Sequence, residues 1–570
     1  MSTNCAKANN ILLVAITRLG DLLQASPTII GLKQENPNAK ITVAVDKQFA
    51  AICNGIPGVD DTYVMDMSMI CRCLEREGEG IVSAYAYITE VLEELRSRNF
   101  DYCLNMSSSG YTALMLKMLG IKESRGWIAD DEGYRLISNP WSMLFAAFVY
   151  HSNRDYNSLN LVDILRCSAG VTAHPDRLMY DIPEEASASA VTFLTENGIA
   201  HGGPLICLQA GASQEKRQWE PRKFSALLKL LVENLNARVI MTGTIQELPI
   251  VNQILKGYSH QQVVSAVGRT NLDQLSALLK KADVLITGDT GPMHLAVAVG
   301  TPVVALFLAS ALAFETGPYS EGNFVIQPQL SCCPCNPNFP CSRPDCHDQI
   351  SPELVFEVTK LRLNTPMGEE KNIHIPINLA NPSEVMVYRT AFDADDFLEF
   401  IPLNKNIAAM RSGSTMRFFD AARNAYRALW KEQFCQIAAK VPSIESPSKS
   451  LAAKPLHSEV RHGLEAIQAH AARGRELIEE LNKLIIDINS PPSKLGAVNG
   501  EINENNREIE ELGLTYPIAG ALVRMFIMEN QNLRGDDPLV LASQLRGLYE
   551  SLYLRTEKFD KLFSHYLQQQ

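Results

Sequence analysis

The sequence lacks features that would place it in several common classes of protein. It has no excess of basic residues, because 52 Lys and Arg stand against 64 Asp and Glu, for a formal net charge of −12. This balance argues against a broad nucleic-acid-binding surface. No long apolar signal-peptide core precedes the first apolar run, so we expect a cytoplasmic protein. Residues 295–314 are apolar over about the length of a membrane span, but Gly300-Thr301-Pro302 interrupts them. We interpret them as a buried helix, a turn and a buried strand.

Cysteine is the residue type with the most uneven distribution. The chain has 570 residues and 13 cysteines, which we expect to be reduced in a large cytosolic protein of several domains. Five crowd into one loop: Cys332, Cys333, Cys335, Cys341 and Cys346. Only the first and third have the C-x-x-C spacing, and no second such pair completes a zinc ribbon. A structural metal, a disulfide and ordinary loop chemistry all stay open, and the candidate metal ligands are Cys333, Cys335, Cys341 and Cys346.

Short apolar runs alternate with amphipathic stretches from residue 11 to 180 and again from 205 to 307. This alternation predicts an α/β fold of two doubly wound, Rossmann-like domains, each a parallel sheet with helices on both faces. The expected strands are 11–16, 41–45, 62–65, 102–105, 205–209, 238–242, 263–265, 284–287 and 303–307, and the expected helices are 21–35, 85–98, 224–235 and 272–281.

The pattern changes after residue 370. Residues 384–403 alternate enough to suggest a strand pair, and helical periodicity then dominates, with long helices expected over 458–488 and 538–567. We therefore expect domains 1–180 and 181–370 and a mainly helical extension, 371–570, of unknown role. A homo-oligomer through this extension is one hypothesis.

Two strand-to-helix turns contain glycine. One is Gly288-Asp-Thr-Gly-Pro-Met-His294, where glycine lets the backbone approach a ligand and the free N–H groups of the helix start can bind an anion such as a pyrophosphate. The other is Thr17-Arg-Leu-Gly-Asp-Leu22, after the first strand. It lacks the G-x-G-x-x-G pattern of dinucleotide enzymes, which argues against an oxidoreductase or epimerase. Ligands of such sheets bind beyond the carboxyl ends of the strands, where both turns lie.

Arg18-Leu-Gly-Asp-Leu-Leu-Gln-Ala-Ser-Pro27 and Asp289-Thr-Gly-Pro-Met-His294 together resemble glycosyltransferase family 9, the heptosyltransferases of lipopolysaccharide core assembly. The resemblance covers residues 10 to 360, roughly, and does not extend into the helical tail. It implies the GT-B architecture, with the acceptor mainly on the first domain and the nucleotide sugar on the second. The implied partners are an ADP-heptose-like nucleotide sugar and a lipopolysaccharide core or other glycolipid, with no nucleic acid. Peripheral contact with the inner face of the inner membrane is a further expectation.

Asp21 is the candidate catalytic base. A carboxylate at this turn can accept a proton from an acceptor hydroxyl, although the commonest use of Asp at such a place is a helix N-cap. The family places its proposed catalytic aspartate in this Gly-Asp pair. Thr17, Arg18 and Gln24 are candidate acceptor contacts, and surface solvation is the alternative for Arg18.

The donor-binding candidates follow strands of the second domain. Ser213 lies in a small-residue turn, and Lys216 or Arg217 can neutralise a leaving diphosphate. The resemblance matches Arg217 to a basic residue two positions before a tryptophan, here Trp219, which could instead serve helix packing. It matches Glu247 to an acid that contacts the nucleoside, although Glu247 could simply cap the next helix.

The second glycine turn completes the expected donor pocket. Thr290 and Gly291 offer backbone N–H groups to the phosphates, beside Asp289. His294 lies close by as a neutral or charged donor, or else as a packing residue.

Neither turn carries the Asp-x-Asp spacing of metal-dependent sugar transferases, and Asp393-Ala394-Asp395 lies outside both expected domains. We therefore expect that no cofactor or divalent ion is required. One displacement with a base and no protein nucleophile implies inversion at the anomeric carbon. The competing hypothesis is a non-catalytic glycan- or nucleotide-binding assembly protein that works through its helical tail.

Overall fold

The computed structural model describes residues 8–16, 18–75, 80–172, 174–336, 338–341, 344–366, 369, 373, 375, 384–404, 415–437, 455–487 and 489–569. The chain folds into two compact units. The sheet unit comprises Met1–Arg125 and Leu159–Ile407, and the helical unit comprises Gly126–Ser158 and Ala408–Gln570.

The first sheet has the strand order β3-β2-β1-β4-β5-β6. Its central strand, β1, pairs in parallel with β2 on one side and β4 on the other. Leu12, Leu13 and Val14 of β1 are fully buried, as expected for a strand covered on both faces. The boundary between the two units falls inside β5. The strands are β1 (Asn10–Ala15), β2 (Lys40–Asp46), β3 (Asp61–Met65), β4 (Tyr102–Asn105), β5 (Glu123–Ala129) and β6 (Arg135–Ser138).

The helices of this first half differ from the expected ones in one respect. A single helix was expected over 21–35, but the chain forms two, which meet at Ala25. Pro27 is the reason, since it has no N–H to donate within a continuous helix and fits the first turn of a new one. The helices are α1 (Leu19–Gln24), α2 (Ser26–Glu35), the 3₁₀ helix η2 (Lys47–Gly55), α3 (Met67–Leu74), α4 (Gly80–Ser97), α5 (Gly110–Leu119) and α7 (Leu161–Ala169).

The second sheet has the order β14-β13-β12-β11-β10-β7-β8-β9. Strands β7 to β12 are parallel, and the chain order reverses between β10 and β7. Such a reversal is the place where doubly wound sheets bind ligands. The strands are β7 (Leu205–Gln209), β8 (Arg238–Thr242), β9 (Val263–Ser265), β10 (Val284–Gly288), β11 (Val303–Leu306), β12 (Phe324–Pro328), β13 (Val385–Phe392) and β14 (Leu398–Pro402).

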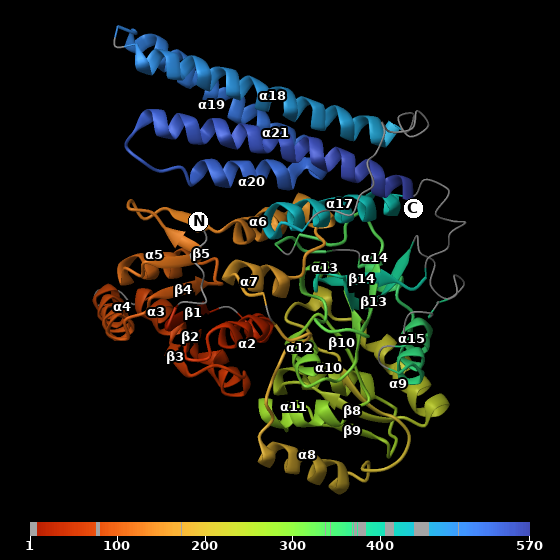
Figure 1. Cartoon of the computed structure of the whole chain (residues 1–570). Coiled ribbons are helices and arrows are strands. Elements are labelled where there is room, and N and C mark those ends of the chain that lie inside the picture. The colour runs from red at the N-terminus through yellow and green to blue at the C-terminus, as the bar shows by residue number, and fades with distance from the viewer. Residues whose placement is uncertain are drawn as a thin grey trace. The chain divides into compact units, whose positions relative to one another are not determined.

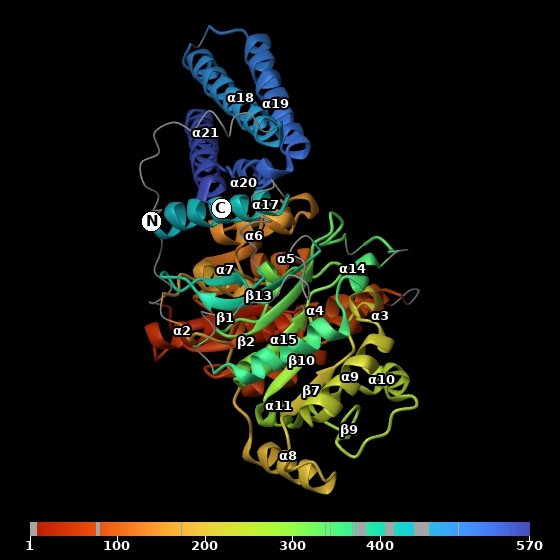
Figure 2. The same cartoon turned by 90° about the vertical axis from the view of Figure 1, so that its right-hand side faces the viewer.

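Helices cover both faces of the second sheet. On one face α9 and α15 lie side by side and bury Leu227, Leu231 and Val355 against the strands (Figures 1 and 2). Helices α8 and α11 also lie side by side. The bounds are α8 (Glu184–Glu196), η4 (Glu215–Arg217), α9 (Pro221–Leu235), η5 (Ile245–Glu247), α10 (Leu248–Leu255), α11 (Leu272–Lys281), α12 (Gly291–Ala298), α13 (Ala313–Thr316), α14 (Asp345–Asp348) and α15 (Pro352–Asn364).

The strand pair expected near 384–403 forms, but it belongs to the second sheet rather than to the helical extension. Strand β13 pairs antiparallel with β12, and β14 pairs with β13. The hairpin thereby covers the otherwise open edge of β12 and buries Val387 and Tyr388. The second sheet therefore continues beyond residue 370, where we had placed the domain boundary.

The helical unit contains β6, α6 (Pro140–Val149), the 3₁₀ helix η3 (His151–Tyr156), α17 (Thr415–Cys435), α18 (Pro455–Ile486), α19 (Pro492–Thr515), the 3₁₀ helix η7 (Pro517–Ala519), α20 (Gly520–Gln531) and α21 (Pro538–Gln569). The helices expected over 458–488 and 538–567 correspond to α18 and α21, although residue 488 lies outside the described residues. Helices α18, α19 and α21 run alongside one another (Figure 1).

Aromatic rings form much of the core of this unit. The ring of Trp141 meets that of Phe434, with centroids 5.6 Å apart, and Phe148 meets Tyr426 at 5.3 Å. Residues 126–158, expected in the first domain, thus supply part of this core. No single helix in the described chain has the length and apolarity of a membrane span. One bent pair, Pro492–Thr515 with Pro517–Gln531, passes that test only jointly, across a 115° bend.

Candidate functional site

The two glycine-containing turns found in the sequence meet in the structure. A Cβ atom at Gly20 would lie 2.9 Å from Cδ2 of His294, and a Cβ atom at Gly291 would lie 3.0 Å from Cδ2 of Leu19. Helix α1 begins at Leu19 and α12 begins at Gly291. A side chain at Gly20 would require the buried ring of His294 to shift, whereas one at Gly291 would require the end of the Leu19 side chain to give by a few tenths of an ångström.

Asp21 lies in the first turn of α1 and is half-buried. The N-cap of α1 is Arg18, so Asp21 does not have the capping role that was its alternative interpretation. Its carboxylate is close enough to His294 to favour the charged imidazole. Burial outweighs this effect and lowers the pKa of His294 to about 4. The imidazole is therefore neutral near pH 7, and its buried Nδ1 has no hydrogen-bond partner among the described residues.

Arg217 and Asp289 form an ion pair at the carboxyl end of β10. Nη1 of Arg217 donates to Oδ2 of Asp289 at 3.1 Å, and Nε donates to Oγ of Ser310 at 2.9 Å. The hydroxyl of Thr316 donates to the other carboxylate oxygen of Asp289 at 3.3 Å. The hydroxyls of Thr287 and Thr290 lie 2.9 Å apart in the same turn. A planar cation and a helix start thus lie together where an anionic group would bind.

Glu247 lies at the carboxyl ends of β7 and β8, directly over two glycines. A Cβ atom at Gly211 would overlap its Oε1, and one at Gly243 would lie 2.9 Å from its Oε2. Glu247 forms a capping box with Thr244 and accepts a hydrogen bond from Nε2 of Gln209 at 3.0 Å. The capping role holds, therefore, but it leaves the carboxylate at the ligand-binding edge of the sheet.

Several predicted residues lie elsewhere or have other contacts. Nζ of Lys216 donates to the carbonyls of Asn336 and Phe339 in the cysteine loop, at 3.1 and 3.0 Å. Gln24 is buried and donates to the carbonyl of Gly20 at 3.3 Å. Arg18 and Ser213 are exposed. Thr17 lies outside the described residues.

Trp219 follows its packing interpretation. It is 2% exposed, its ring lies edge-on to Phe224, and its indole N–H donates to the carbonyl of Ile350 at 3.3 Å. It anchors the end of the Arg217 segment against α9 and α15.

The cysteine loop packs beside this segment. The proximity of Cys333, and then of His347, lowers the pKa of the Cys346 thiol below its usual range. Nε2 of His347 lies 3.0 Å from the carbonyl of Lys216. No group of three or more His, Cys, Asp or Glu side chains within the described ranges is placed to hold a metal ion. None of the five cysteines of this loop is joined in a disulfide.

Sequence reasoning missed Ser107, Gln209, Ser310 and Thr316. Oγ of Ser107 accepts a hydrogen bond from the N–H of Ile16 at 3.0 Å, which ties the end of β4 to the first glycine turn. The serine run at 107–109 comes just after a strand that the sequence predicts, so the sequence could have indicated that these residues lie at the ligand-binding end of the sheet. Ser310 and Thr316 have no such signal, because their roles depend on the path of the connection between β11 and β12.

Two doubly wound sheets that meet through the turns at their ligand-binding ends have the GT-B architecture. Residues 88–340 match the family profile described as glycosyltransferase family 9 (heptosyltransferase). A family 9 glycosyltransferase of Veillonella parvula shares the fold, with a TM-score of 0.52 and 19% identity over 64% of this chain and 98% of that one.

Two curated relatives agree with this match. Lipopolysaccharide heptosyltransferase 3 of Escherichia coli K12 is 25% identical over 305 residues, which is 53% of this chain and 83% of that protein. Lipopolysaccharide core heptosyltransferase OpsX of Haemophilus influenzae is 23% identical over 321 residues, 56% of this chain and 84% of that protein. The protein is a glycosyltransferase, and over these residues it is similar to the heptosyltransferases of family 9.

Proposed function

We propose that this protein transfers a heptose, or a related sugar, from an ADP-linked or other nucleotide donor to a lipopolysaccharide core or surface glycan. The observation that carries the proposal is the meeting of Asp21 and His294 at the junction of the two glycine turns. The similarity to lipopolysaccharide heptosyltransferases supports the sugar and the acceptor class, and the resemblance to family 9 supports an ADP-linked donor.

Asp21 is the proposed base. It takes the proton of the acceptor hydroxyl while the hydroxyl oxygen attacks the anomeric carbon. The bond from that carbon to the donor diphosphate breaks, and its electron pair leaves with the diphosphate oxygen. This single displacement inverts the anomeric configuration. His294 supports Asp21 as a neutral imidazole, because its pKa is lowered to about 4, and so it does not neutralise the charge of the base.

Arg217 and the start of α12 are proposed to receive the diphosphate. The guanidinium carries the positive charge, and the first N–H groups of α12 offer hydrogen bonds. These groups lie at the carboxyl end of β10, next to the order reversal of the sheet. We infer that they supply the charge stabilisation that a divalent ion gives in other transferases. Glu247 and Gln209 are proposed to contact the nucleoside.

Transfer assays with purified full-length protein test this proposal. ADP-heptose and a heptose-deficient lipopolysaccharide are the substrates, and product is followed by ADP release and mass spectrometry. We expect transfer by the wild type, no change in rate with EDTA, and an inverted linkage by NMR. Asp21→Asn should lower kcat by about 100-fold or more while ADP affinity stays within about threefold. Normal transfer by Asp21→Asn would remove Asp21 from its role. A rate that EDTA abolishes would overturn the metal-independent mechanism.

A further inference from the structure

The connection between β11 and β12, residues 309–319, carries two of the contacts that fix the proposed donor site. Ser310 accepts from Arg217, and Thr316 donates to Asp289. The connection itself is nearly all buried. The positions of the cation and of its carboxylate partner therefore depend on where this connection lies.

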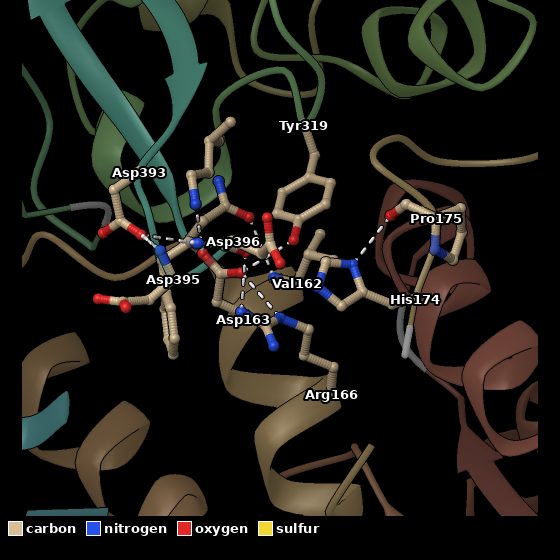
Figure 3. Close-up of polar contacts among 12 residues, drawn as sticks. Val162, Asp163, Arg166, His174, Pro175, Tyr319, Asp393, Asp395 and Asp396 are labelled. Atoms are coloured by element: carbon tan, nitrogen blue, oxygen red, sulfur yellow. Dashed lines mark hydrogen bonds and ion pairs between the residues drawn. The ribbon is translucent and has the colours of Figure 1, made fainter. Parts of the chain in front are cut away.

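Helix α7 holds the far end of the connection. Nδ2 of Asn160, the N-cap of α7, donates to the carbonyl of Gly317 at 3.3 Å. The hydroxyl of Tyr319 donates to Oδ1 of Asp163 at 2.9 Å. Figure 3 shows Tyr319 pointing from its loop to the Asp163 carboxylate at the start of α7.

The carboxylate of Asp163 is held in place by further buried partners besides Tyr319. It is 0% exposed and pairs with Nε of Arg166 at 3.0 Å. Its Oδ2 accepts from the N–H of Leu398, at the start of β14, at 3.0 Å. Nη2 of Arg166 donates to the carbonyl of Asp396 in the β13–β14 turn at 3.0 Å (Figure 3). A buried carboxylate with partners from α7, the hairpin and the connection has little freedom to move.

Packing at Gly317 restricts the connection further. A Cβ atom there would lie 2.5 Å from both the carbonyl oxygen of Ala313 and Cζ of Phe400. Phe314 also packs edge-on against Phe400 of β14, with ring centroids 5.2 Å apart. The backbone between Thr316 and Tyr319 therefore fits tightly between α7 and the hairpin, so a change at one end is transmitted to the other.

We propose that Asn160, Asp163 and Tyr319 are positioning residues for the nucleotide-sugar donor. They hold the 309–319 connection so that Ser310 and Thr316 keep Arg217 and Asp289 in place for the diphosphate. The inference rests on the proposed function of Arg217 and Asp289. Asn160 bonds to Gly317 of the connection, and Asp163 accepts from Tyr319 at its far end, so their effect on Arg217 and Asp289 passes through the connection.

Tyr319→Phe tests the proposal, with Tyr258→Phe as the matched control. The hydroxyl of Tyr258 is buried and has no hydrogen-bond partner among the described residues, so its loss should change nothing. We measure ADP affinity by titration calorimetry, the KM for donor and acceptor, kcat, and the melting temperature. For Tyr319→Phe we expect ADP Kd and donor KM to rise about five- to tenfold, as loss of one buried hydrogen bond implies. The values of kcat and acceptor KM should stay within about twofold.

Unchanged ADP affinity in Tyr319→Phe would overturn the proposal. A fall in kcat together with a rise in the KM for both substrates, in step with a lower melting temperature, would also overturn it, because this pattern would indicate a general structural role. Failure of the wild type to bind any nucleoside diphosphate would instead defeat the proposed function. A well-folded wild type that binds ADP, beside a Tyr319→Phe variant that binds it equally well, defeats only this inference.

A second variant covers the case in which Tyr319→Phe does not fold. Asn160→Ser keeps an oxygen that can cap α7, where Asn160 accepts from the N–H of Val162 at 3.0 Å, but removes the donor to Gly317. It should show the same selective loss of donor affinity. In the double variant Thr316→Val with Tyr319→Phe we expect less than the product of the two single effects, because both act on one path. If the loss of donor affinity in the double variant equals the product of the two single losses, Thr316 and Tyr319 act independently and the proposed path through the connection is wrong.

Discussion

Arg217 and Asp289 are joined by a 3.1 Å ion pair, and the two side chains are only 15% and 12% exposed. The pair connects the segment after β7 with the turn after β10, the two strands between which the chain order of the second sheet reverses. Because Arg217 also donates to Ser310, its guanidinium is held by two partners.

The two contacts of the Arg217 guanidinium lead to the first prediction. Lys does not reproduce the fixed geometry of the contacts to Asp289 and Ser310, because it has one compact charge on a flexible stem. We expect Arg217→Lys to lower kcat/KM for the donor by about tenfold and Arg217→Ala by about 100-fold. Steady-state kinetics at saturating acceptor checks this. Lys216→Ala is the control, because the Lys216 side chain contacts the cysteine loop instead. An equal loss of kcat/KM in this variant would show that the guanidinium of Arg217 has no specific role.

The close approach of Gly20 and His294 leads to a second prediction. In Gly20→Ala the new Cβ would lie 2.9 Å from the ring of His294, which is buried and has little room to yield. We expect a loss of about 1–3 kcal/mol in the free energy of unfolding and a sharp fall in transfer. Gly110→Ala is the matched control, since nothing lies within 4 Å of a Cβ there. Urea denaturation of both variants decides the matter, and equal stability would contradict the packing of the two turns.

The pKa of His294 gives a third prediction. Burial lowers it from 6.5 to about 4, so the unfolded chain binds a proton there that the folded protein does not bind between those values. Stability should be complete above about pH 6.5 and fall by about 3 kcal/mol as the pH drops to about 4. In His294→Gln this contribution should vanish. Urea midpoints from pH 4.5 to 8 measure it, and parallel curves for the two proteins would show that His294 is not buried as a neutral group.

The buried pair of Asp163 and Arg166 gives a fourth prediction. Asp163→Asn leaves the guanidinium without its counter-charge, which should cost about 3–5 kcal/mol in the free energy of unfolding. Glu479→Gln is the control, because its pair with Arg546 is 53% exposed on both sides and should matter by less than about 1 kcal/mol. Denaturation followed by circular dichroism compares them. A loss in Asp163→Asn no larger than in the control would mean that the pair is solvated.

Much of the fold follows from apolar periodicity. The strands at 102–105, 205–209 and 238–242 have the bounds that the sequence predicts, because buried parallel strands are continuous apolar runs between polar turns. The long helices are equally clear. The hairpin at 385–402 was predicted as a strand pair but not as part of the second sheet, since strand pairing is a long-range contact that no local pattern reveals.

The site divides in the same way. Glycine turns are local signals, so the junction at Gly20 and Gly291 was within reach of the sequence. Lys216 and Arg217 are adjacent in the chain and chemically alike, and only the folded structure shows that Arg217 faces Asp289 while Lys216 holds the cysteine loop. The contacts of Ser310, Thr316 and Tyr319 depend on the path of a buried connection, which composition does not encode.

The division of the chain at Gly126, Ser158 and Ala408 has a practical consequence for anyone who shortens the gene. The helical unit is assembled from two distant stretches, so a stop codon placed after the hairpin would remove only one of them. Trp141, Phe148 and Tyr156, all under 9% exposed in the intact protein, would lose their aromatic partners and be left facing water. A clean deletion of the unit therefore needs an internal excision as well as a truncation.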